Sequence, residues 1–412
     1  MKCKVGDLVN IVSGYAFKSK DYTEEGIPVI KIKNIVPPSI DYKDTNKISV
    51  SNLGKYEKWV LSYNDILISL TGSNVNQIAS AVGKVGRVKT KEKLLLNQRV
   101  GKFENISPDE LDIDYFYYWI SRFDIQYKLA SSATGSANQA NISPKQIKDL
   151  EIELPSIEIQ RKVSNILKSL DSKIELNNQM IDILEEIAST LFKRWFVDFE
   201  FPDENGNPYK SSGGKMIDSE LGEIPDGWEI KRLSEIANYK NGLAMQKFRP
   251  LENEDSLPVL KIKELNQGYT DRNSDRCSID INEDVKIYDG DIIFSWSGTL
   301  IVDIWTGGNA GLNQHLFKVT SEKYPKWFYY LWTKFYLNKF IAIAKDKATT
   351  MGHIKRQHLN ESIVCIPKDF EPLNQTLEGI INKVENLGKS NRDLEQTRDL
   401  LLPKLLSGEI EV

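Results

Sequence analysis

One segment of the sequence occurs twice: IPVIKIK at residues 27–33 returns as LPVLKIK at residues 257–263. Three more segments recur in the same order, as DILIS at 65–69 and DIIFS at 291–295, LNQR at 96–99 and LNQH at 312–315, and FYY at 116–118 and 328–330. The offset between the copies falls only from 230 to 212 residues. A solenoid has shorter and more numerous repeats than this. We therefore expect two copies of one domain, an arrangement that suits a ligand with two halves.

Length and composition are those of an ordinary globular protein. The chain has 412 residues, enough for two full hydrophobic cores and their connections. Residues 1–10 are charged and lack the apolar core of a signal peptide, and no apolar run is long enough to span a bilayer. The three cysteines are far apart, which argues against a disulfide framework and against a zinc site. We expect a cytoplasmic protein with no membrane partner and no metal site.

The charge distribution bears on possible partners. The formal net charge is −4, which argues against a protein that binds nucleic acid alone. Residues 1–155 carry 21 Lys and Arg against 18 Asp and Glu, a balance of +3. Residues 156–214, with 7 against 10, and residues 371–412, with 5 against 8, each have a balance of −3. If DNA is the ligand, another protein must therefore supply part of the positive charge that neutralises the phosphates.

Each repeat has the signals of a mixed α/β domain. Both begin with alternating apolar residues typical of strands, at residues 5–12 and 230–239. Both also contain an aromatic stretch typical of a helix, at residues 115–129 and 327–344. Strand and helix signals within each copy predict two domains of the same mixed class.

The ends of the two domains are marked by prolines. A short strand-like segment precedes Pro155 in the first repeat and Pro367 in the second. We therefore place the domains at residues 1–155 and 221–370. Residues 201–220 are polar and rich in Gly, Asn and Pro, which indicates a linker.

The segments that follow the two domains change to a heptad pattern. In residues 156–200 and 371–412 the apolar residues alternate in steps of four and three, which predicts two long helices. Each pattern contains one Asn, Asn177 or Asn391. If the helices pair antiparallel with these residues facing each other, almost every other layer is apolar, and a buried Asn pair is a known device for fixing register. We expect one antiparallel coiled coil; two separate surface helices are the alternative.

The sequence contains no recognisable catalytic motif. It has no Gly-x-x-x-x-Gly-Lys-Ser/Thr loop for a nucleotide and no His-Glu-x-x-His for a metal. Asp226, Glu229 and Lys231 resemble a metal-dependent nuclease motif, but such acidic residues lie on separate strands, whereas here only a turn separates them. The Asn-Pro-Tyr at residues 207–209 lacks the second proline expected of an adenine methyltransferase. We therefore expect a protein that is not an enzyme and has no catalytic residues.

Polar residues suited to contacting bases gather in glycine-rich segments of both repeats. Asn and Gln can form paired hydrogen bonds with adenine, and Arg or Lys with guanine. The segments are residues 69–74, 97–99 and 135–141 in the first repeat and 297–299, 313–315 and 349–353 in the second. The Asn-Gln pairs at 97–98 and 313–314 recur in both copies, and closing a turn explains them equally well.

Segments that differ between the repeats while lying between matched strands are the best candidates for base contact. In the first domain the candidates are Lys18, Lys20, Thr71, Ser73, Asn74, Ser136, Asn138 and Gln139. In the second domain they are Gln246, Lys247, Arg249, Thr299, Lys345, Lys347, Thr350 and His353. Four lysines occur in both copies, so we expect them to bind phosphates or to pack on the sheet: Lys31, Lys33, Lys261 and Lys263.

Three motifs are typical of a known family. LGEIPDGW at 221–228 opens the second repeat, LFKRWFVDF at 191–199 follows the first helix, and LLPKLLSGEI at 401–410 ends the second helix. With these motifs the chain resembles, over its whole length, the specificity (S) subunit of a type I restriction-modification enzyme. The first repeat departs from the pattern because it lacks the Gly-Trp opening and starts directly at residues 4–7.

The resemblance implies an α+β protein in which two repeated target recognition domains, of mixed α/β fold, are separated by two long antiparallel helices that form a coiled coil. Each domain would bind one half of a split, asymmetric site in double-stranded DNA. The helices would dock two methyltransferase (M) subunits, and restriction (R) subunits would join through this methyltransferase core. S-adenosylmethionine, ATP and Mg would belong to the partner subunits, with no cofactor in this chain.

Helix length would then act as a ruler between the two half-sites. About 29 residues of heptad seam give a rod of roughly 43 Å, comparable to the roughly 34–36 Å between half-site centres one DNA turn apart. Two other functions remain open at this point. One is a fused DNA modification or cleavage enzyme with a divergent active site, and the other is a purely structural coiled-coil adaptor.

Overall fold

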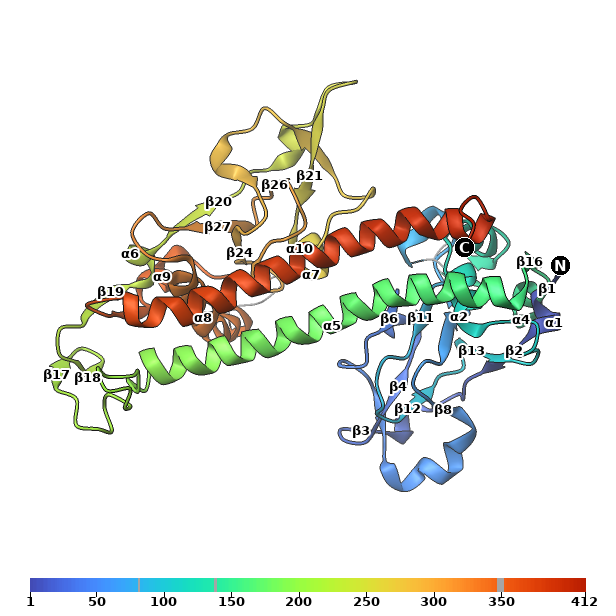
Figure 1. Ribbon diagram of the computed structural model, residues 1–412, viewed down its shortest axis with the longest axis horizontal. Coiled ribbons are helices and arrows are strands. Elements are labelled where there is room, and N and C mark those ends of the chain that lie inside the picture. The colour runs from blue at the N-terminus through green and yellow to red at the C-terminus, as the bar shows by residue number, and fades with distance from the viewer. Residues whose placement is uncertain (81, 137–138, 347–351) are drawn as a thin grey trace. The chain divides into compact units, whose positions relative to one another are not determined.

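The computed structural model describes residues 1–80, 82–136, 139–346 and 352–412 (Figure 1). Its contacts divide the chain into two compact units. The first unit comprises Met1–Leu170 and Arg398–Val412, and the second comprises Asp171–Thr397. Each unit contains one repeat, of mixed strands and helices, and a part of each of two long helices. The predicted α+β fold class is confirmed.

The first unit is built on two main β-sheets. The larger sheet has the strand order β2 (Val9–Ser13), β13 (Val100–Asn105), β9 (Ile66–Ser69), β11 (Val85–Arg87), β6 (Ser39–Ile40) and β5 (Ile35–Val36). The other has the order β3 (Tyr22–Thr23), β7 (Lys47–Ile48), β4 (Ile27–Ile30), β12 (Leu94–Leu96) and β8 (Val60–Leu61). The larger sheet packs on the helices α2 (Ile113–Ile120) and α3 (Phe123–Ser131). Phe103 meets Phe116 in this core, with ring centroids 5.0 Å apart.

The second unit repeats this plan with two four-stranded sheets. One has the order β20 (Asn238–Asn241), β27 (Leu316–Thr320), β24 (Ile292–Ser295) and β25 (Val302–Ile304). The other has the order β22 (Arg276–Ser278), β21 (Ser256–Leu260), β26 (Ala310–Leu312) and β23 (Lys286–Ile287). The first of these sheets packs on α8 (Lys326–Asp346), where Phe294 and Phe340 are stacked with centroids 5.8 Å apart.

The repeated segments form the same strand pair in both units. β4 pairs parallel with β12, with Ile30 opposite Leu96, and β21 pairs parallel with β26, with Leu260 opposite Leu312. A parallel pair requires a long connection between its strands. This is why the two sequence segments that match best between the repeats are far apart along each repeat but adjacent in the sheet.

Both predicted opening strands contain a helical turn. α1 (Val5–Leu8) occupies the first part of residues 5–12, and α6 (Leu233–Ile236) lies within residues 230–239, so these parts of the predicted strand segments are helical instead. In α1 the backbone N–H of Lys4 donates to the Asp7 carboxylate (3.0 Å), and in α6 Arg232 donates to Glu235 in the same way (2.5 Å). An acidic residue in this position caps a helical turn. Buried apolar residues lie on the short helices themselves, as Val5 and Leu8 in α1 and Leu233 and Ile236 in α6, and continue on the adjoining strands.

The helix predicted at residues 115–129 is also not continuous. α2 ends before residues 121–122, and α3 begins after them, whereas α8 in the second unit is one helix of 21 residues. The Ser121 hydroxyl donates to the carbonyl of Tyr117 (2.6 Å). Thr333 makes the same bond to the carbonyl of Tyr329 (2.6 Å) inside the continuous α8, so this hydrogen bond is not the cause of the break. The break lies at Arg122, whose backbone is extended (φ −63°, ψ 141°).

The last strand of each domain returns to the first. β16 (Glu151–Glu153) pairs with β1 (Lys2–Lys4), and β28 (Ile363–Ile366) pairs with β19 (Glu229–Arg232). A long helix begins a few residues after each of these last strands. In the second unit a hairpin of β17 (Met216–Ser219) and β18 (Gly222–Pro225) lies across the boundary placed between residues 220 and 221.

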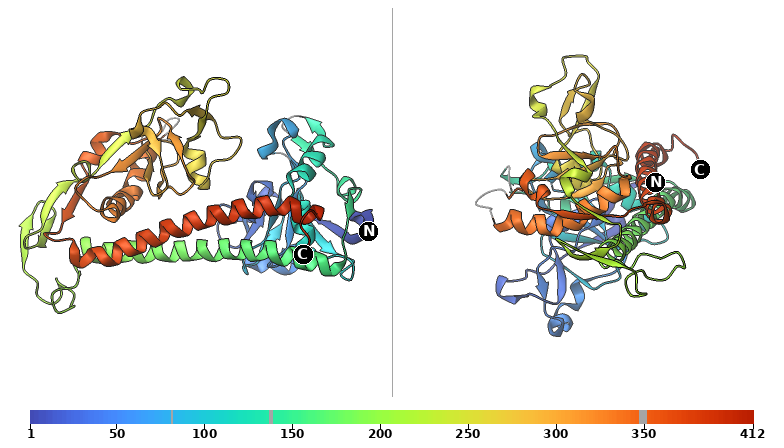
Figure 2. Two further views of the ribbon diagram at one scale, coloured as in Figure 1. Left: turned by 45° about the horizontal axis from the view of Figure 1, so that its top comes forward. Right: turned by 90° about the vertical axis from the view of Figure 1, so that its left-hand side faces the viewer.

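The long helices are α5 (Ile157–Phe196) and α10 (Glu371–Ser407), drawn green and red in Figures 1 and 2. In the second unit Asn177 is fully buried and donates from Nδ2 to Oδ1 of Asn391 (2.8 Å). Asn391 in turn donates from Nδ2 to Oδ1 of Asn178 (2.7 Å). This is the antiparallel Asn layer that the heptad pattern predicts. No helix among the described residues is long and apolar enough to cross a membrane.

The same seam continues within the first unit. There Val163 and Leu167 of α5 share a hydrophobic cluster with Leu401 and Leu405 of α10. In the second unit Ile381, outside the predicted seam, is buried because the domain packs on this side of α10.

Charged residues form ion pairs and hydrogen bonds between the second domain and both long helices of its unit. On α5, Glu185 accepts a hydrogen bond from the Tyr330 hydroxyl (2.9 Å) and pairs with Lys334 (2.8 Å). On α10, Arg392 pairs with Asp289 (2.7 Å). The domain is therefore held by specific polar contacts as well as by apolar packing.

Candidate nucleic-acid interface

The turn at residues 97–100 and 313–316, here called the Asn turn, has the same hydrogen bonds in both units. Asn97 and Asn313 are buried, and each donates its backbone N–H to the neighbouring parallel strand over 3.1 Å. Each also accepts a hydrogen bond at Oδ1 from the backbone N–H of residue 99 or 315, over 3.3 Å in both units. These two asparagines therefore build the turn, which is the structural alternative that the sequence left open.

A glycine in each unit lets another strand approach the Asn turn. An added Cβ at Gly14 or Gly242 would lie 2.3 Å from the carbonyl oxygen of Asn97 or Asn313. Cβ atoms do not come so close to backbone oxygen, so any other residue would displace the strand. The pair of Gly and Asn thus gives both units the same backbone frame.

In the first unit several predicted contact residues meet beside the Asn turn. The backbone N–H of Leu70 donates to the carbonyl of Arg99 (2.9 Å). The following β10 (Thr71–Gly72) pairs with β15 (Gln139–Asn141), which also pairs with β14 (Thr134–Ser136). The small sheet brings Ser73 and Asn74 near the exposed Gln139, while the side chain of Thr71 is mostly buried.

The second unit has the same junction. The backbone N–H of Trp296 donates to the carbonyl of His315 (3.3 Å), and Ser297 forms a β-bridge with His353. This bridge brings the predicted residues Thr299 and His353 to one place. The exposed Lys345, near the end of α8, lies close to this bridge, because Gly352 packs against the carbonyl of Ala344.

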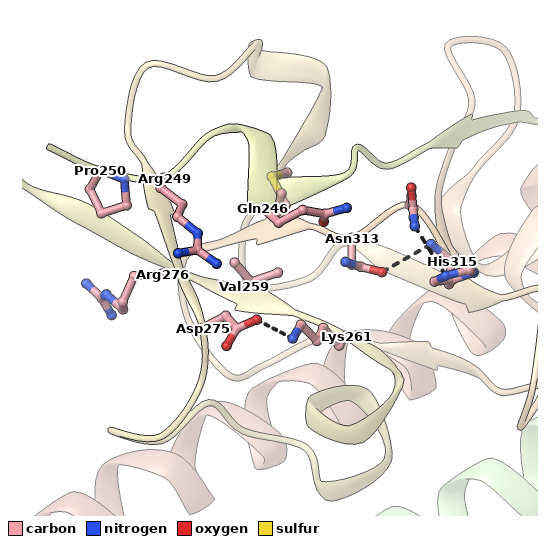
Figure 3. Close-up of a pocket in the computed structure, with 11 residues that line it drawn as sticks. Gln246, Arg249, Pro250, Val259, Lys261, Asp275, Arg276, Asn313 and His315 are labelled. Atoms are coloured by element: carbon pink, nitrogen blue, oxygen red, sulfur yellow. Dashed lines mark hydrogen bonds and ion pairs between the residues drawn. The ribbon is translucent and has the colours of Figure 1, made fainter.

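A hollow of about 630 Å³ opens beside the Asn turn of the second unit and is here called the β21–β26 hollow (Figure 3). It brings together three of the predicted contact residues: Gln246, Arg249 and Lys261. Five further polar residues line it: Asp275, Arg276, Asn313, Gln314 and His315. Three cations against one carboxylate make the lining positive, and its amide and imidazole groups can form directed hydrogen bonds. Such a set can accept a phosphate or the edge of a base.

The lysines shared by both repeats have partners within their own units. Lys31 donates to Oδ1 of Asn46 (2.6 Å), and Lys261 binds the carboxylate of Asp275, which occupies the equivalent place. The hydrogen bond from Lys261 holds the pKa of Asp275 below its usual value. An ammonium group has three donors, so each of these lysines keeps donors for a further ligand.

The other shared pair lies at the surface. Lys33 pairs with Asp44 (3.1 Å) and Lys263 with Glu264 (3.8 Å). Glu264 is buried, but the side chains of Lys33 and Lys263 are themselves 56% and 60% exposed, so both ammonium groups can also contact a ligand.

The remaining candidates are spread over the surface or lie outside the described residues. Lys18 precedes the short helix η1 (Ser19–Asp21), and Lys20 lies within it. Lys247 is the last residue of η5 (Met245–Lys247), and all three lysines are exposed. Of Ser136 only the backbone is described. The predictions for Asn138, Lys347 and Thr350 fall outside the described residues. In the part of the chain that the structure describes, no group of three or more His, Cys, Asp or Glu side chains is arranged to hold a metal ion.

The candidate list leaves out residues at the Asn turn and in the hollow. Arg99 and His315 follow the shared Asn-Gln pair, and their difference is a signal that the aligned repeats contain. Asp275 and Arg276 carry no such signal, because only the fold brings β22 beside the Asn turn.

Comparison with known proteins agrees with this duplicated architecture. The family model for the type I restriction modification DNA specificity domain matches residues 1–186 and 225–398. The two matched regions cover both repeats and most of both long helices.

Individual relatives match over most of their length. The specificity subunit of the type I restriction enzyme MjaIX from Methanocaldococcus jannaschii is 27% identical over 99% of this chain and 93% of its own. The HindI specificity subunit from Haemophilus influenzae is 24% identical over 68% of this chain and 73% of its own. The crystal structure of a type I S subunit from M. genitalium has the same fold, with a TM-score of 0.55 and 17% identity over 98% of this chain and 95% of that one. The chain belongs to the family of type I restriction-modification DNA specificity subunits.

Proposed function

We propose that this chain recognises an asymmetric, two-part site in double-stranded DNA, with one domain on each half. The observation that carries the proposal is the Asn turn, which has the same backbone frame in both units but different side chains around it. A common frame can approach two DNA segments in the same way, while different side chains select different bases.

We further propose that the long helices dock methyltransferase subunits. Four exposed apolar residues of α5 follow a second heptad stripe within the second unit: Leu176, Met180, Ile183 and Ile187, at 52%, 36%, 57% and 42% exposure. Each precedes a residue of the inner seam, and one residue corresponds to about 100° around a helix. A helix with two apolar stripes at this angle is suited to packing against a further helix.

Catalysis and cofactors would then belong to the partners. We place S-adenosylmethionine on the methyltransferase subunits, and ATP and Mg on the restriction subunits that join through them. Basic surfaces of these partners would also supply the phosphate neutralisation that a chain of net charge −4 lacks. A fused modification or cleavage enzyme remains the alternative.

The test is to assemble the chain with the methyltransferase subunits of its own system and map the methylated sites by methylation-sensitive sequencing. We expect a split motif with different half-sites, and no methylation or nicking by the chain alone. Exchanging residues 1–155 for those of a relative should change one half-site and leave the other half-site and the spacer unchanged. Methylation or nicking by the purified chain would favour the enzyme alternative.

The docking proposal has its own test. Replacing Leu176 and Ile183 by Asp should abolish co-purification with the methyltransferase subunit, because charged groups cannot be buried in an apolar contact. Ser189→Asp is the matched control, since this exposed residue lies on α5 away from both stripes. Equal retention of the subunit by both variants would contradict docking on this stripe.

A further inference from the structure

The residue after the shared Asn-Gln pair is held by the same contacts in both units but differs in identity. Arg99 and His315 each donate a backbone N–H to the buried Asn of the turn and offer a carbonyl to the loop that begins at Leu70 or Trp296. The backbone of each residue is therefore held at both its N–H and its carbonyl group. What differs is only the side chain presented at the edge of the turn.

The Arg99 side chain makes no polar contact that supports the fold among the described residues. It is exposed, and among the described residues its guanidinium has neither an ion-pair nor a hydrogen-bond partner. By contrast, Arg87 is buried beside Asp114 (2.7 Å), and Arg122 binds Asp124 through two hydrogen bonds. An arginine on a rigid turn with all five donors available is suited to a planar partner with two acceptors.

His315 is held in a defined orientation. Its Nδ1 lies 3.1 Å from the Ser297 hydroxyl, and its ring packs at 5.8 Å on Trp296. Trp296 is itself fixed, because its indole N–H donates to Oδ1 of Asn241 (3.0 Å). His315, labelled in Figure 3, lines the β21–β26 hollow. Gln314 lines it as well.

From this geometry, and on the basis of the proposed function, we propose that residues 99 and 315 each select one base in their own half-site. Arg99 selects guanine, because a guanidinium can donate two hydrogen bonds to O6 and N7 in the major groove. His315, positioned by Ser297, contacts a base at the equivalent position of the other half-site. The shared lysines beside the turns are left to bind the backbone phosphates.

The proposal is tested with the complex of the full chain and its methyltransferase subunits. Arg99→His should change the accepted base at one position of one half-site, and His315→Arg should introduce guanine at one position of the other. Arg99→Lys keeps the charge but loses the two-donor fork. It should reduce discrimination for guanine by about 5- to 150-fold, as expected for one bidentate pair, while affinity for unrelated DNA stays the same.

Arg122→His is the matched control, because it removes an arginine of the same domain that already has a partner; its motif should not change. If Arg99→His and Arg99→Lys weaken all sequences alike and leave the motif unchanged, the residue contacts phosphate and the inference is wrong, although the proposed function stands. If the wild-type complex methylates no defined sequence, the proposed function itself fails.

Discussion

Asp303 should make the second unit less stable as the pH rises. It lies on β25 near Glu185 of α5, and burial together with the Glu185 charge raises its pKa from 3.8 to about 6. Lys334 and the backbone N–H of Ile304, which donates to Oδ1 of Asp303 over 2.8 Å, oppose this shift only in part. Between the unfolded pKa of 3.8 and the folded pKa of about 6, this carboxyl is therefore protonated in the folded chain but ionised in the unfolded chain.

The sign and size of the effect follow from linkage. A raised pKa in the folded state contributes stability that is complete below the unfolded pKa, near 4, and is lost as the pH rises through about 6. A shift of this size corresponds to about 3 kcal/mol at full value. Because residue 303 keeps some contact with solvent, we expect about 1–2 kcal/mol of this to be observed.

Asp303→Asn keeps the acceptor for Ile304 but cannot ionise. Urea denaturation of the full chain should give similar free energies of unfolding for variant and wild type at pH 4, with the variant more stable by about 1–2 kcal/mol at pH 8. Asp280→Asn, at an exposed position of the same unit, is the control and should show no such trend. A difference between Asp303→Asn and wild type that stays constant from pH 4 to pH 8 would refute the reasoning.

Three further predictions concern the helices, the Asn turn and the phosphates. Asn391→Ala removes the acceptor of the buried Asn177 amide and should lower the free energy of unfolding by about 1–3 kcal/mol in urea denaturation; no loss would mean that the layer contributes nothing. Gly242→Ala places a Cβ 2.3 Å from backbone oxygen and should destabilise the chain by about 1–3 kcal/mol, whereas Gly379→Ala, with open space around it, should not. Lys31→Ala should weaken binding of the complex to all sequences alike and lower the salt slope by about one unit; a loss at one base position would instead make Lys31 a base contact.

The long helices were the part of the fold most accessible from sequence. A heptad seam is a property of one helix face, so the spacing of apolar residues determines the Asn177–Asn391 layer without knowledge of the domains. The duplication likewise predicts two similar domains, because equal segments in equal order fold in the same way. Sequence also suggested Gln246, Arg249 and Lys261, which the fold brings into one hollow.

Other features depend on contacts that a single sequence does not reveal. The turns α1 and α6 replace strand because an acidic side chain caps each one, and their apolar spacing fits strand and short helix equally well. Asp275 and Arg276 enter the hollow only because β22 pairs beside β21. The role of Asn97 and Asn313 became clear only from their backbone hydrogen bonds.

The Asn turn separates the residues that hold the fold from the residues that differ between the domains. Gly14, Gly242 and the two buried asparagines carry the steric and hydrogen-bonding constraints, whereas the outward-facing positions beside them carry few. Substitutions at exposed positions without structural contacts usually change stability by less than about 0.5 kcal/mol. In an evolving lineage, such positions can vary one at a time without a compensating change elsewhere, so the two halves of a duplicated gene are free to diverge in ligand preference while both continue to fold.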